Sequence, residues 1–259
     1  MSTLRYFLLP LIVLSLLRPI SAEAFQTNFG LPEGYLTNLV GEGAWKGQFG
    51  SGLNGKSGNS ESVDINMTLK LDRETDVSTT NLLASYFYGS NAISTVTDRV
   101  FAQLRQERKL AKEGWAWYVQ TAVEWDRFKA FDYRIAVHSG LSNQFYKDDS
   151  GFLKVRMGAG ASKEVGSANE EWSPELQFGG DWERKLTDTT KVFATVDYFP
   201  NVTDFADFRV NTNMGFNFLV DAPRNINFRV FALTRYDSTP PPGTEQSDID
   251  YGMALVFGF

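Results

Sequence analysis

Apolar and polar side chains alternate along most of the chain, from Trp45 to the C-terminus. The last segment shows the pattern most clearly, because every second residue is large and apolar. These residues are Ile249, Tyr251, Met253, Leu255, Phe257 and Phe259. The positions between them carry smaller or polar side chains, and successive side chains of a strand point to opposite faces. The alternation therefore predicts a β-strand with one apolar and one polar face.

Similar segments recur along the chain and are separated by turn residues. They begin near residues 45, 61, 79, 97, 115, 131, 152, 173, 191, 206, 226 and 249. The spacing of roughly 18 residues leaves room for the 9–11 residues with which a tilted strand crosses a bilayer. We therefore expect an all-β fold, an antiparallel transmembrane β-barrel of about twelve strands, whose even strand number returns both ends to one side of the membrane.

The predicted connections fall into two classes that alternate along the chain. Every second connection is short and polar, whereas the others vary in length up to Ser238–Ser247 with its three prolines. The short ones are Asp72–Val77, Ala111–Gly114, Lys147–Gly151, Thr187–Thr190 and Asp221–Asn225. Short turns on the periplasmic side and longer loops on the outside are typical of outer-membrane barrels.

Tryptophans on the apolar face occur in pairs ten residues apart, Trp115 with Trp125 and Trp172 with Trp182. Ten residues of a tilted strand project to about 25 Å along the barrel axis, the height of a lipid-facing band bordered by aromatic girdles. The predicted membrane-interface aromatics are Trp45, Trp115, Trp117, Trp125, Trp172 and Trp182. Outer-membrane lipid is thus the first expected partner.

The first 44 residues do not follow the alternating pattern. Arg5, the apolar run Tyr6–Leu17 and the small residues around Glu23 predict a signal peptide over residues 1–24. Residues 25–44 are expected to be a leader segment with a short helical turn or no order, and residues 45–259 the barrel. The predicted location is the outer membrane, after secretion across the inner membrane.

Composition excludes several classes of function. The formal charge of −6 becomes −7 once residues 1–24 are removed, which argues against nucleic acid as a partner. The chain has no cysteine and a single histidine, His138, so thiolate and multi-histidine metal sites are excluded and no cofactor is expected.

The polar faces of the predicted strands carry charges of both signs. A mixed lumen favours pairing across the barrel over a strongly selective pore, where one sign would dominate a ring. We read the Lys129-Ala130 connection as a tight hairpin that brings neighbouring charges together. The predicted lumen ionic network contains Glu124, Asp126, Asp132, Arg134, Lys154, Arg156, Arg209 and Arg229.

Several motifs resemble a known family over about residues 45–259. They are Trp45-Lys46-Gly47, Ser57-Gly58-Asn59-Ser60, Asp98-Arg99, Glu124-Trp125-Asp126-Arg127-Phe128, Asp132-Tyr133-Arg134, Tyr198-Phe199-Pro200 and the terminal Phe259. In this order they resemble the YdiY-like family of salt-induced outer-membrane proteins, whose domain has no established biochemical function. The resemblance implies an outer-membrane location and a link to salt or osmotic stress, and it implies no reaction.

Three functional readings follow. The first is a non-enzymatic structural barrel or narrow passive channel, inserted by the barrel-assembly machinery through a C-terminal signal. That signal comprises Tyr251, Met253, Leu255, Phe257 and Phe259. The second is a soluble periplasmic β-sandwich or β-clam that binds an apolar ligand, and the third a membrane-embedded lipid hydrolase. A hydrolase needs a nucleophile and a base in contact, yet Ser142 lies about 13 Å from His138 along one strand. The oligomeric state stays open.

Overall fold

The computed structural model describes residues 45–56, 62–91, 93–168, 170–240 and 245–259. The predicted signal peptide and leader segment lie outside the described residues. In the described part of the chain, no helix is long and apolar enough to cross a membrane.

Twelve strands make up the described chain. They are β1 (Trp45–Lys56), β2 (Ser62–Glu74), β3 (Ser78–Asn91), β4 (Thr95–Lys109), β5 (Trp115–Asp126), β6 (Tyr133–Asp148), β7 (Gly151–Val165), β8 (Trp172–Lys185), β9 (Thr190–Pro200), β10 (Phe208–Asp221), β11 (Ile226–Asp237) and β12 (Ser247–Gly258). Each strand begins within two residues of its predicted start. The predicted strand number and class are therefore confirmed.

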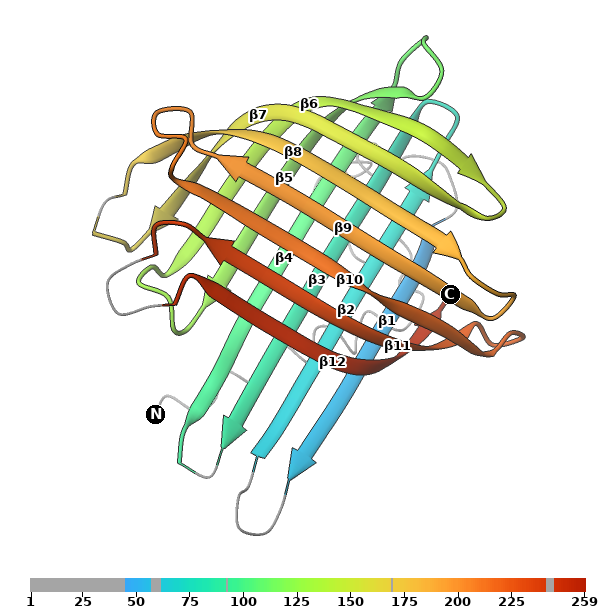
Figure 1. Ribbon diagram of the computed structural model, residues 1–259, viewed down its shortest axis with the longest axis horizontal. Helices are drawn as coiled ribbons and strands as arrows, with labels where there is room; N and C mark the ends of the chain where they lie inside the picture. The colour runs from blue at the N-terminus through green and yellow to red at the C-terminus, as the bar shows by residue number, and fades with distance from the viewer. Residues whose placement is uncertain (1–44, 57–61, 92, 169, 241–244) are drawn as a thin grey trace, which may run out of the picture. The chain divides into compact units, whose positions relative to one another are not determined.

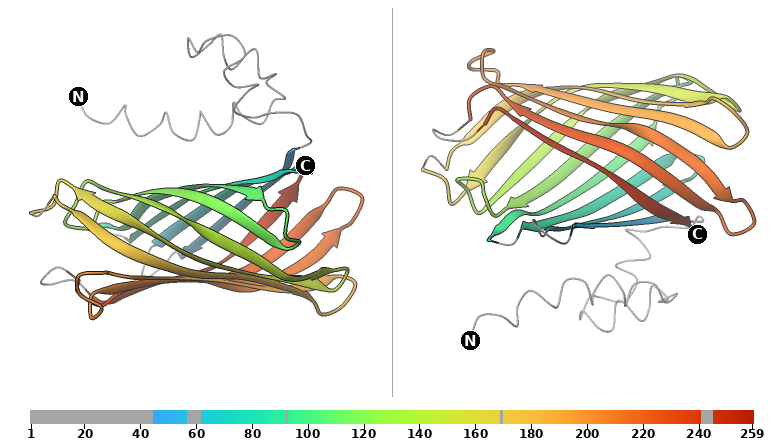
Figure 2. Two further views of the ribbon diagram at one scale, coloured as in Figure 1. Left: turned by 90° about the horizontal axis from the view of Figure 1, so that it is seen from above. Right: turned by 60° about the horizontal axis from the view of Figure 1, so that its bottom comes forward.

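The strands close into one barrel. Each strand pairs antiparallel with its neighbours in the chain, and β12 returns to pair with β1 (Figure 1). The strands are inclined to the barrel axis, as Figure 2 shows from two further directions. Closure gives every strand two neighbours, so this fold is a barrel and the alternative of a two-layered sandwich is wrong.

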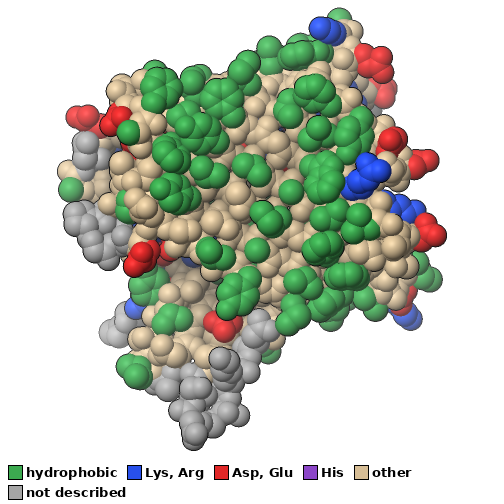
Figure 3. Space-filling model, viewed as in Figure 1, with side chains coloured by type: hydrophobic (Ala, Val, Ile, Leu, Met, Phe, Trp, Pro, Cys, Tyr) green, Lys and Arg blue, Asp and Glu red, His purple; other side chains and the backbone are tan. Residues whose placement is uncertain are grey.

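The register between strands places the alternating residues on two surfaces. Large apolar side chains are exposed on the outside of most strands, where an aqueous protein would seldom tolerate so large an apolar patch. Examples are Leu104, Val123, Val137, Leu141, Met157, Phe178, Val196, Met214, Phe216, Val230, Leu255 and Phe257. On the face seen in Figure 3, apolar side chains are spread over the barrel surface and charged ones lie mostly near its two ends. An apolar outside and a polar inside is the arrangement of a membrane-spanning barrel.

The two ends of the barrel differ in the length of their connections. One end, here called the turn end, holds both barrel termini and the turns 75–77, 110–114, 149–150, 186–189 and 222–225. The other, the loop end, holds 57–61, 92–94, 127–132, 166–171, 201–207 and 238–246. Gly114, with φ of 76°, occupies a backbone region that favours glycine in one of the short turns. The predicted alternation of short and variable connections is thus present.

Aromatic side chains line both borders of the apolar surface. Near the loop end, four rings on adjacent strands follow one another at centroid distances of 6.2, 5.5 and 5.6 Å. They are Phe178, Tyr198, Phe208 and Tyr236. Trp125 and Trp172 also lie near the loop end. The other four predicted tryptophans lie toward the turn end, and they are Trp45, Trp115, Trp117 and Trp182. The indole of Trp182 donates a hydrogen bond to the Tyr146 hydroxyl at 3.0 Å, a polar contact suited to a membrane interface.

The two termini of the barrel are joined at the turn end. Gly47 and Phe259 exchange two backbone hydrogen bonds, of 2.7 and 2.9 Å. A side chain at Gly47 would lie 2.2 Å from the Phe259 ring, so only glycine leaves room for that ring. The last residue of the chain is thereby held in the barrel wall.

Val119 lies on the outside of β5, midway between Trp115 and Trp125. A Val119→Arg substitution should destabilise the membrane-inserted barrel by about 2–4 kcal/mol, the cost of arginine at mid-bilayer. Urea unfolding in phospholipid vesicles measures this change. Val77→Arg is the matched control, because Val77 is exposed in a turn. Equal effects of the two substitutions would contradict a lipid-facing β5.

Candidate functional site: the ionic network of the lumen

The inside of the barrel carries a dense set of charged and amide side chains. Many of them are buried even though they lie on a polar face. The buried inward ones include Arg99, Arg105, Glu107, Gln120, Asp126, His138, Arg156, Glu175, Gln177 and Asp197. Burial of a charge is costly unless the charge is paired, so the partners of these residues define the site.

A first group of ion pairs lies along the wall formed by β4 to β9. Arg156 contacts Asp181, and its other terminal nitrogen donates to Asp197 at 3.0 Å. Asp181 also accepts from Arg105 at 3.1 Å. Glu107 lies 3.3 Å from Arg105, and it accepts from Lys154 at 2.8 Å. Three cations therefore balance three carboxylates, and the group joins β4 to β7 and β8, and β7 to β8 and β9, on the inside.

Gly179 makes room for this wall group. A side chain at that position would lie 2.3 Å from an Asp197 oxygen and 2.7 Å from an Arg156 nitrogen. Asp197 also accepts from Gln177 at 3.2 Å, and Gln177 in turn accepts from the Tyr118 hydroxyl at 2.9 Å. The hydrogen bonds thus extend the ion pairs into one buried polar layer.

The single histidine lies beside a second, smaller group. His138 Nε2 is 3.2 Å from Glu175 Oε2, while Ser162 Oγ and Arg209 Nη2 each donate to Glu175 Oε1 at 2.6 Å. Arg209 also lies over the Phe199 ring at 5.4 Å. Because the Ser162 hydroxyl is held by the carboxylate, this arrangement is a buried anion with three donors rather than a serine activated by histidine.

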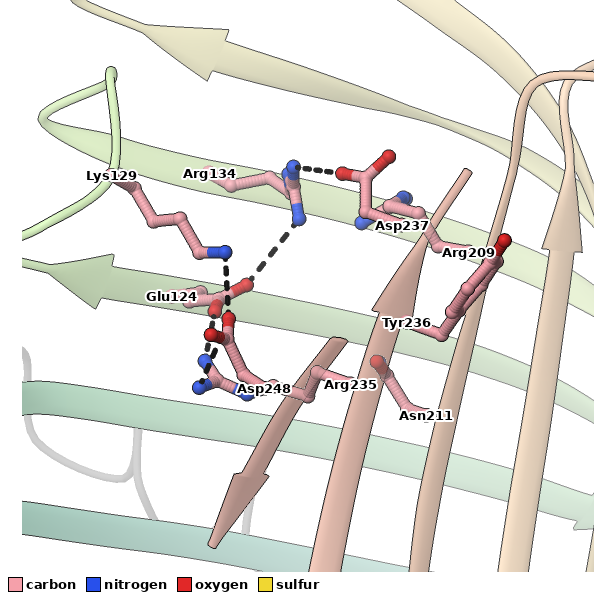
Figure 4. Close-up of a pocket in the computed structure, with 9 residues that line it drawn as sticks. All are labelled: Glu124, Lys129, Arg134, Arg209, Asn211, Arg235, Tyr236, Asp237 and Asp248. Atoms are coloured by element: carbon pink, nitrogen blue, oxygen red, sulfur yellow. Dashed lines mark hydrogen bonds and ion pairs between the residues drawn. The ribbon is translucent and has the colours of Figure 1, made fainter. Parts of the chain in front are cut away.

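The third group lies at the loop end of the lumen, and several of its side chains line the pocket in Figure 4. Arg235 donates to Glu124 at 2.9 Å and lies 3.6 Å from Asp126, 3.6 Å from Asp248 and 3.7 Å from Asp250. Since β5 and β11 are six strands apart in a ring of twelve, the Arg235–Glu124 pair spans the barrel. This pair and its surrounding charges are called the cross-lumen group below.

Three further cations complete the cross-lumen group. Arg134 contacts Glu164 and lies 3.5 Å from Glu124 and 3.6 Å from Asp237, which is on β11. Lys129, in the loop after β5, donates to Asp248 at 2.7 Å. Arg99 donates to Asp250 at 2.5 Å. Side chains from β4, β5 and β6 therefore meet those of β11 and β12 across the lumen.

An apolar cluster lies on the inside next to these charges. It consists of Phe87, Phe231, Ala254 and Val256, with Phe193 and Leu233 packed against it. The rings of Phe87 and Phe231 meet edge to face at 6.4 Å, although they come from β3 and β11. The interior is thus partly filled by apolar side chains, as in small barrels.

Arg229 differs from the other predicted network residues. It donates to Asn217 at 2.7 Å and Gln48 at 3.2 Å, and lies 5.3 Å from the centre of the Phe193 ring. In the described part of the chain no carboxylate lies within ion-pair distance of Arg229. Its positive charge is held by amide oxygens and an aromatic face.

The structure places seven of the eight predicted network residues on the inward face, and Asp132 is the exception. β6 begins at Tyr133 and its pairing with β5 ends at Glu124↔Arg134, so Asp132 lies in the loop. The tight hairpin expected at Lys129-Ala130 is also wrong, because the connection spans residues 127–132. Within the described ranges, Asp132 forms no ion pair.

Several members of the network were not singled out by the sequence. These are Arg99, Glu107, Lys129, Glu164, Asp237 and Asp248. Arg99 and Glu107 could have been predicted from the sequence. Both lie an even number of residues from Arg105 on β4, so all three side chains point to the same face. Asp237 and Asp248 lie at strand ends, where parity is hard to extend from a pattern. Among the described residues, no group of three or more His, Cys, Asp or Glu side chains could hold a metal ion.

The closed barrel, its apolar outside and its charged inside define a β-barrel of the outer-membrane type. The chain belongs to the family of proteins of unknown function DUF481, whose model matches residues 50–259. No curated protein matches the sequence.

Solved structures with a similar architecture include several outer-membrane proteins. The NanC porin is 9% identical with a TM-score of 0.45, over 83% of this chain and 98% of that chain. An outer membrane channel from Pseudomonas putida F1 is 11% identical with a TM-score of 0.45, over 85% and 96%. The translocator domain of the autotransporter NalP from Neisseria meningitidis is 13% identical with a TM-score of 0.40, over 93% and 98%. At these identities and scores the comparisons assign this chain no substrate or activity.

Arg156 is the most deeply buried cation of the wall group, with a side chain that is 0% exposed. Arg156→Gln should lower the free energy of unfolding by about 3–5 kcal/mol, because Asp181 and Asp197 lose their shared partner in a buried setting. Urea unfolding and the heat-induced shift of the folded band on a gel report the change. Arg184→Gln, at an exposed position on the outer face of β8, should leave both unchanged. A stable Arg156→Gln barrel would show that the wall group does not hold the strands.

Proposed function

We propose that this protein is a non-enzymatic outer-membrane barrel that works as a narrow passive channel, kept almost closed by the cross-lumen group. The observation that carries the proposal is Arg235, which reaches across the lumen to Glu124 and is surrounded by three more carboxylates. A guanidinium in this position divides the lumen, since its partners come from opposite walls.

The balance of charge supports a weakly selective passage. The wall group is neutral, and the cross-lumen group contains both signs within ion-pair distance. Strong selectivity requires a ring of one sign, and wide aqueous pores belong to barrels of 16–18 strands. A twelve-stranded barrel with paired charges fits a small conductance for ions or small polar solutes.

The apolar cluster supports the second candidate, a structural barrel without a passage. Phe87 and Phe231 meet inside the lumen and leave less room beside the charges. The two candidates differ in one property, ion flow through the purified protein. The implied link to salt or osmotic stress belongs to the same proposal, and its support is the resemblance of the sequence motifs.

The location and the route of assembly are part of the same proposal. The apolar outer surface is suited to a lipid environment, and bacterial single-chain barrels are found in the outer membrane of Gram-negative cells. The C-terminal residues Tyr251 to Phe259 would serve as the signal for the barrel-assembly machinery. Their support is the row of exposed apolar side chains on β12 that ends at Phe259.

Planar-bilayer recording of the purified protein tests the channel. The wild type should show a small conductance with little selectivity. Arg235→Gln should raise the conductance several-fold and favour cations, because it leaves Glu124, Asp126, Asp248 and Asp250 with less positive charge among them. Arg224→Gln is the control, since Arg224 pairs with Asp221 in an exposed turn. Absence of current in both the wild type and Arg235→Gln would favour the structural barrel.

The proposed orientation places the turn end in the periplasm and the loop end outside the cell. Because the chain has no cysteine, single cysteines can be introduced at exposed positions of either end. Val202→Cys, at the loop end, should react with a membrane-impermeant maleimide in intact cells. Asp188→Cys, at the turn end, should react only after the outer membrane is permeabilised. The reverse pattern would invert the barrel.

A further inference from the structure

The seam between β1 and β12 is much shorter than the other contacts between strands. The two strands share four residue pairs, Gln48–Ser51 with Leu255–Gly258, and the Gly47–Phe259 hydrogen bonds extend this seam by one residue. Other neighbouring strands share between eight and fifteen pairs. The pairs of this seam lie at the turn end, and toward the loop end β1 and β12 diverge in all views (Figures 1 and 2).

Side chains beyond the last pair are unusually exposed on the outer face. Leu53 is 72% exposed, Ile249 61% and Tyr251 84%. In the paired part of the same seam, Leu255 is 47% exposed and Phe257 42%. The difference arises because β1 is paired only with β2 there, and β12 only with β11. Leu53, Ile249 and Tyr251, here called the lips of the gap, are apolar and continue the lipid-facing surface. Their strands nevertheless leave backbone groups unpaired, which is costly in lipid.

The inner side of this gap is closed by side chains instead of a backbone ladder. Arg99 on β4 donates to Asp250 on β12, and Phe87 on β3 packs on Phe231 of β11. A side chain at Gly252 would lie 3.4 Å from the Asn66 amide nitrogen of β2. We call Phe87, Arg99, Phe231 and Asp250 the latch. Such contacts can separate without breaking any strand pairing.

The latch contains chemistry for both parts of an amphiphile. Phe87 and Phe231 belong to the apolar cluster with Ala254 and Val256, directly inside β11 and β12. Arg99 and Asp250 carry charges at the edge of that cluster, and Arg99 lies 4.8 Å from the Phe87 ring centre. An apolar chain would therefore pass from the apolar lips to the apolar cluster while its polar end meets the ion pair.

We propose that the gap between β1 and β12 is a lateral portal, through which an amphiphile in the membrane inserts its apolar chain into the Phe87–Phe231 cluster. The occupant is a single-chain amphiphile supplied by the bilayer, because the lips are continuous with the lipid-facing surface. This site shares Arg99 and Asp250 with the cross-lumen group, but it is reached from the bilayer and does not require ion conduction.

A photoreactive amphiphile tests the portal. The probe is a dodecylphosphocholine analogue with a diazirine at the end of its chain, added to the full chain in phosphatidylcholine nanodiscs. Illumination should label the peptides that contain inward Phe87 and Phe231, as well as outward residues such as Phe257, and mass spectrometry locates the labels. Labels confined to outward residues would overturn the proposal.

Locking the seam supplies the decisive comparison. Continuing the register of Gln48↔Gly258 places Leu53 opposite Met253, so oxidised Leu53→Cys/Met253→Cys should tie the lips together. Labelling of Phe87 and Phe231 should fall to background and return on reduction. Thr212→Cys/Thr234→Cys, a pair across the complete β10–β11 seam, is the matched control and should label like the wild type. Undiminished lumen labelling in the locked protein would show entry through a barrel mouth and contradict the portal.

The latch has its own test in the same assay. Arg99→Gln removes the ion pair with Asp250, so lumen labelling should increase several-fold over the wild type. Unchanged labelling would remove Arg99 from the latch. Conductance of the wild type is recorded separately, because lumen labelling through the seam does not depend on whether ions flow along the barrel axis. Failure of the channel and failure of the portal are therefore distinguishable.

Discussion

The structure depends on one constraint, that backbone donors and acceptors inside a membrane must be satisfied within the protein. Strands meet it only by closing into a barrel, and closure sends alternate side chains to lipid and to the lumen. The outer surface must then be apolar, and the polar side chains of every strand are gathered in a small interior. The dense charge inside the barrel is therefore a consequence of closure, and pairing of these charges follows from the cost of leaving them alone.

Charges in such an interior can pair in two ways, and this barrel uses both. Pairs along one wall, such as Arg156 with Asp197, join nearby strands and leave the bore unaffected. Pairs between opposite walls, such as Arg235 with Glu124, cross the bore. Glu124 contributes to both kinds, since it also lies 3.5 Å from Arg134 on the neighbouring strand. Stability and closure of the lumen are thus linked through a single carboxylate.

The alternation of apolar and polar residues predicted most of the fold, because a strand in a membrane barrel cannot depart from this alternation for more than a residue or two. Strand starts, the sorting of turns and the inward parity of Arg134, Lys154 and Arg156 follow from it. Partners across the lumen do not, since the sequence does not state which strands face each other. Asp132 shows a second limit of the sequence. The segment 127–132 is compatible with a loop of six residues as well as with a tight hairpin. The sequence also did not predict the short pairing between β1 and β12, because β12 has the clearest alternation of all the strands.

Asp250 connects the seam to the lumen. It accepts from Arg99 at 2.5 Å on the latch side and lies 3.7 Å from Arg235 on the side of the cross-lumen group. Two arginines share one carboxylate, so a weaker contact with one favours a closer contact with the other. Movement of β12 away from Arg99 would carry β11 and Arg235 with it, away from Glu124 on the opposite wall, because Arg235 is paired with Asp248 in the β11–β12 ladder. The incomplete ladder at the seam thus makes β12 the strand through which the lateral gap and the bore respond to each other, while the complete ladders of the other strands hold the rest of the barrel fixed.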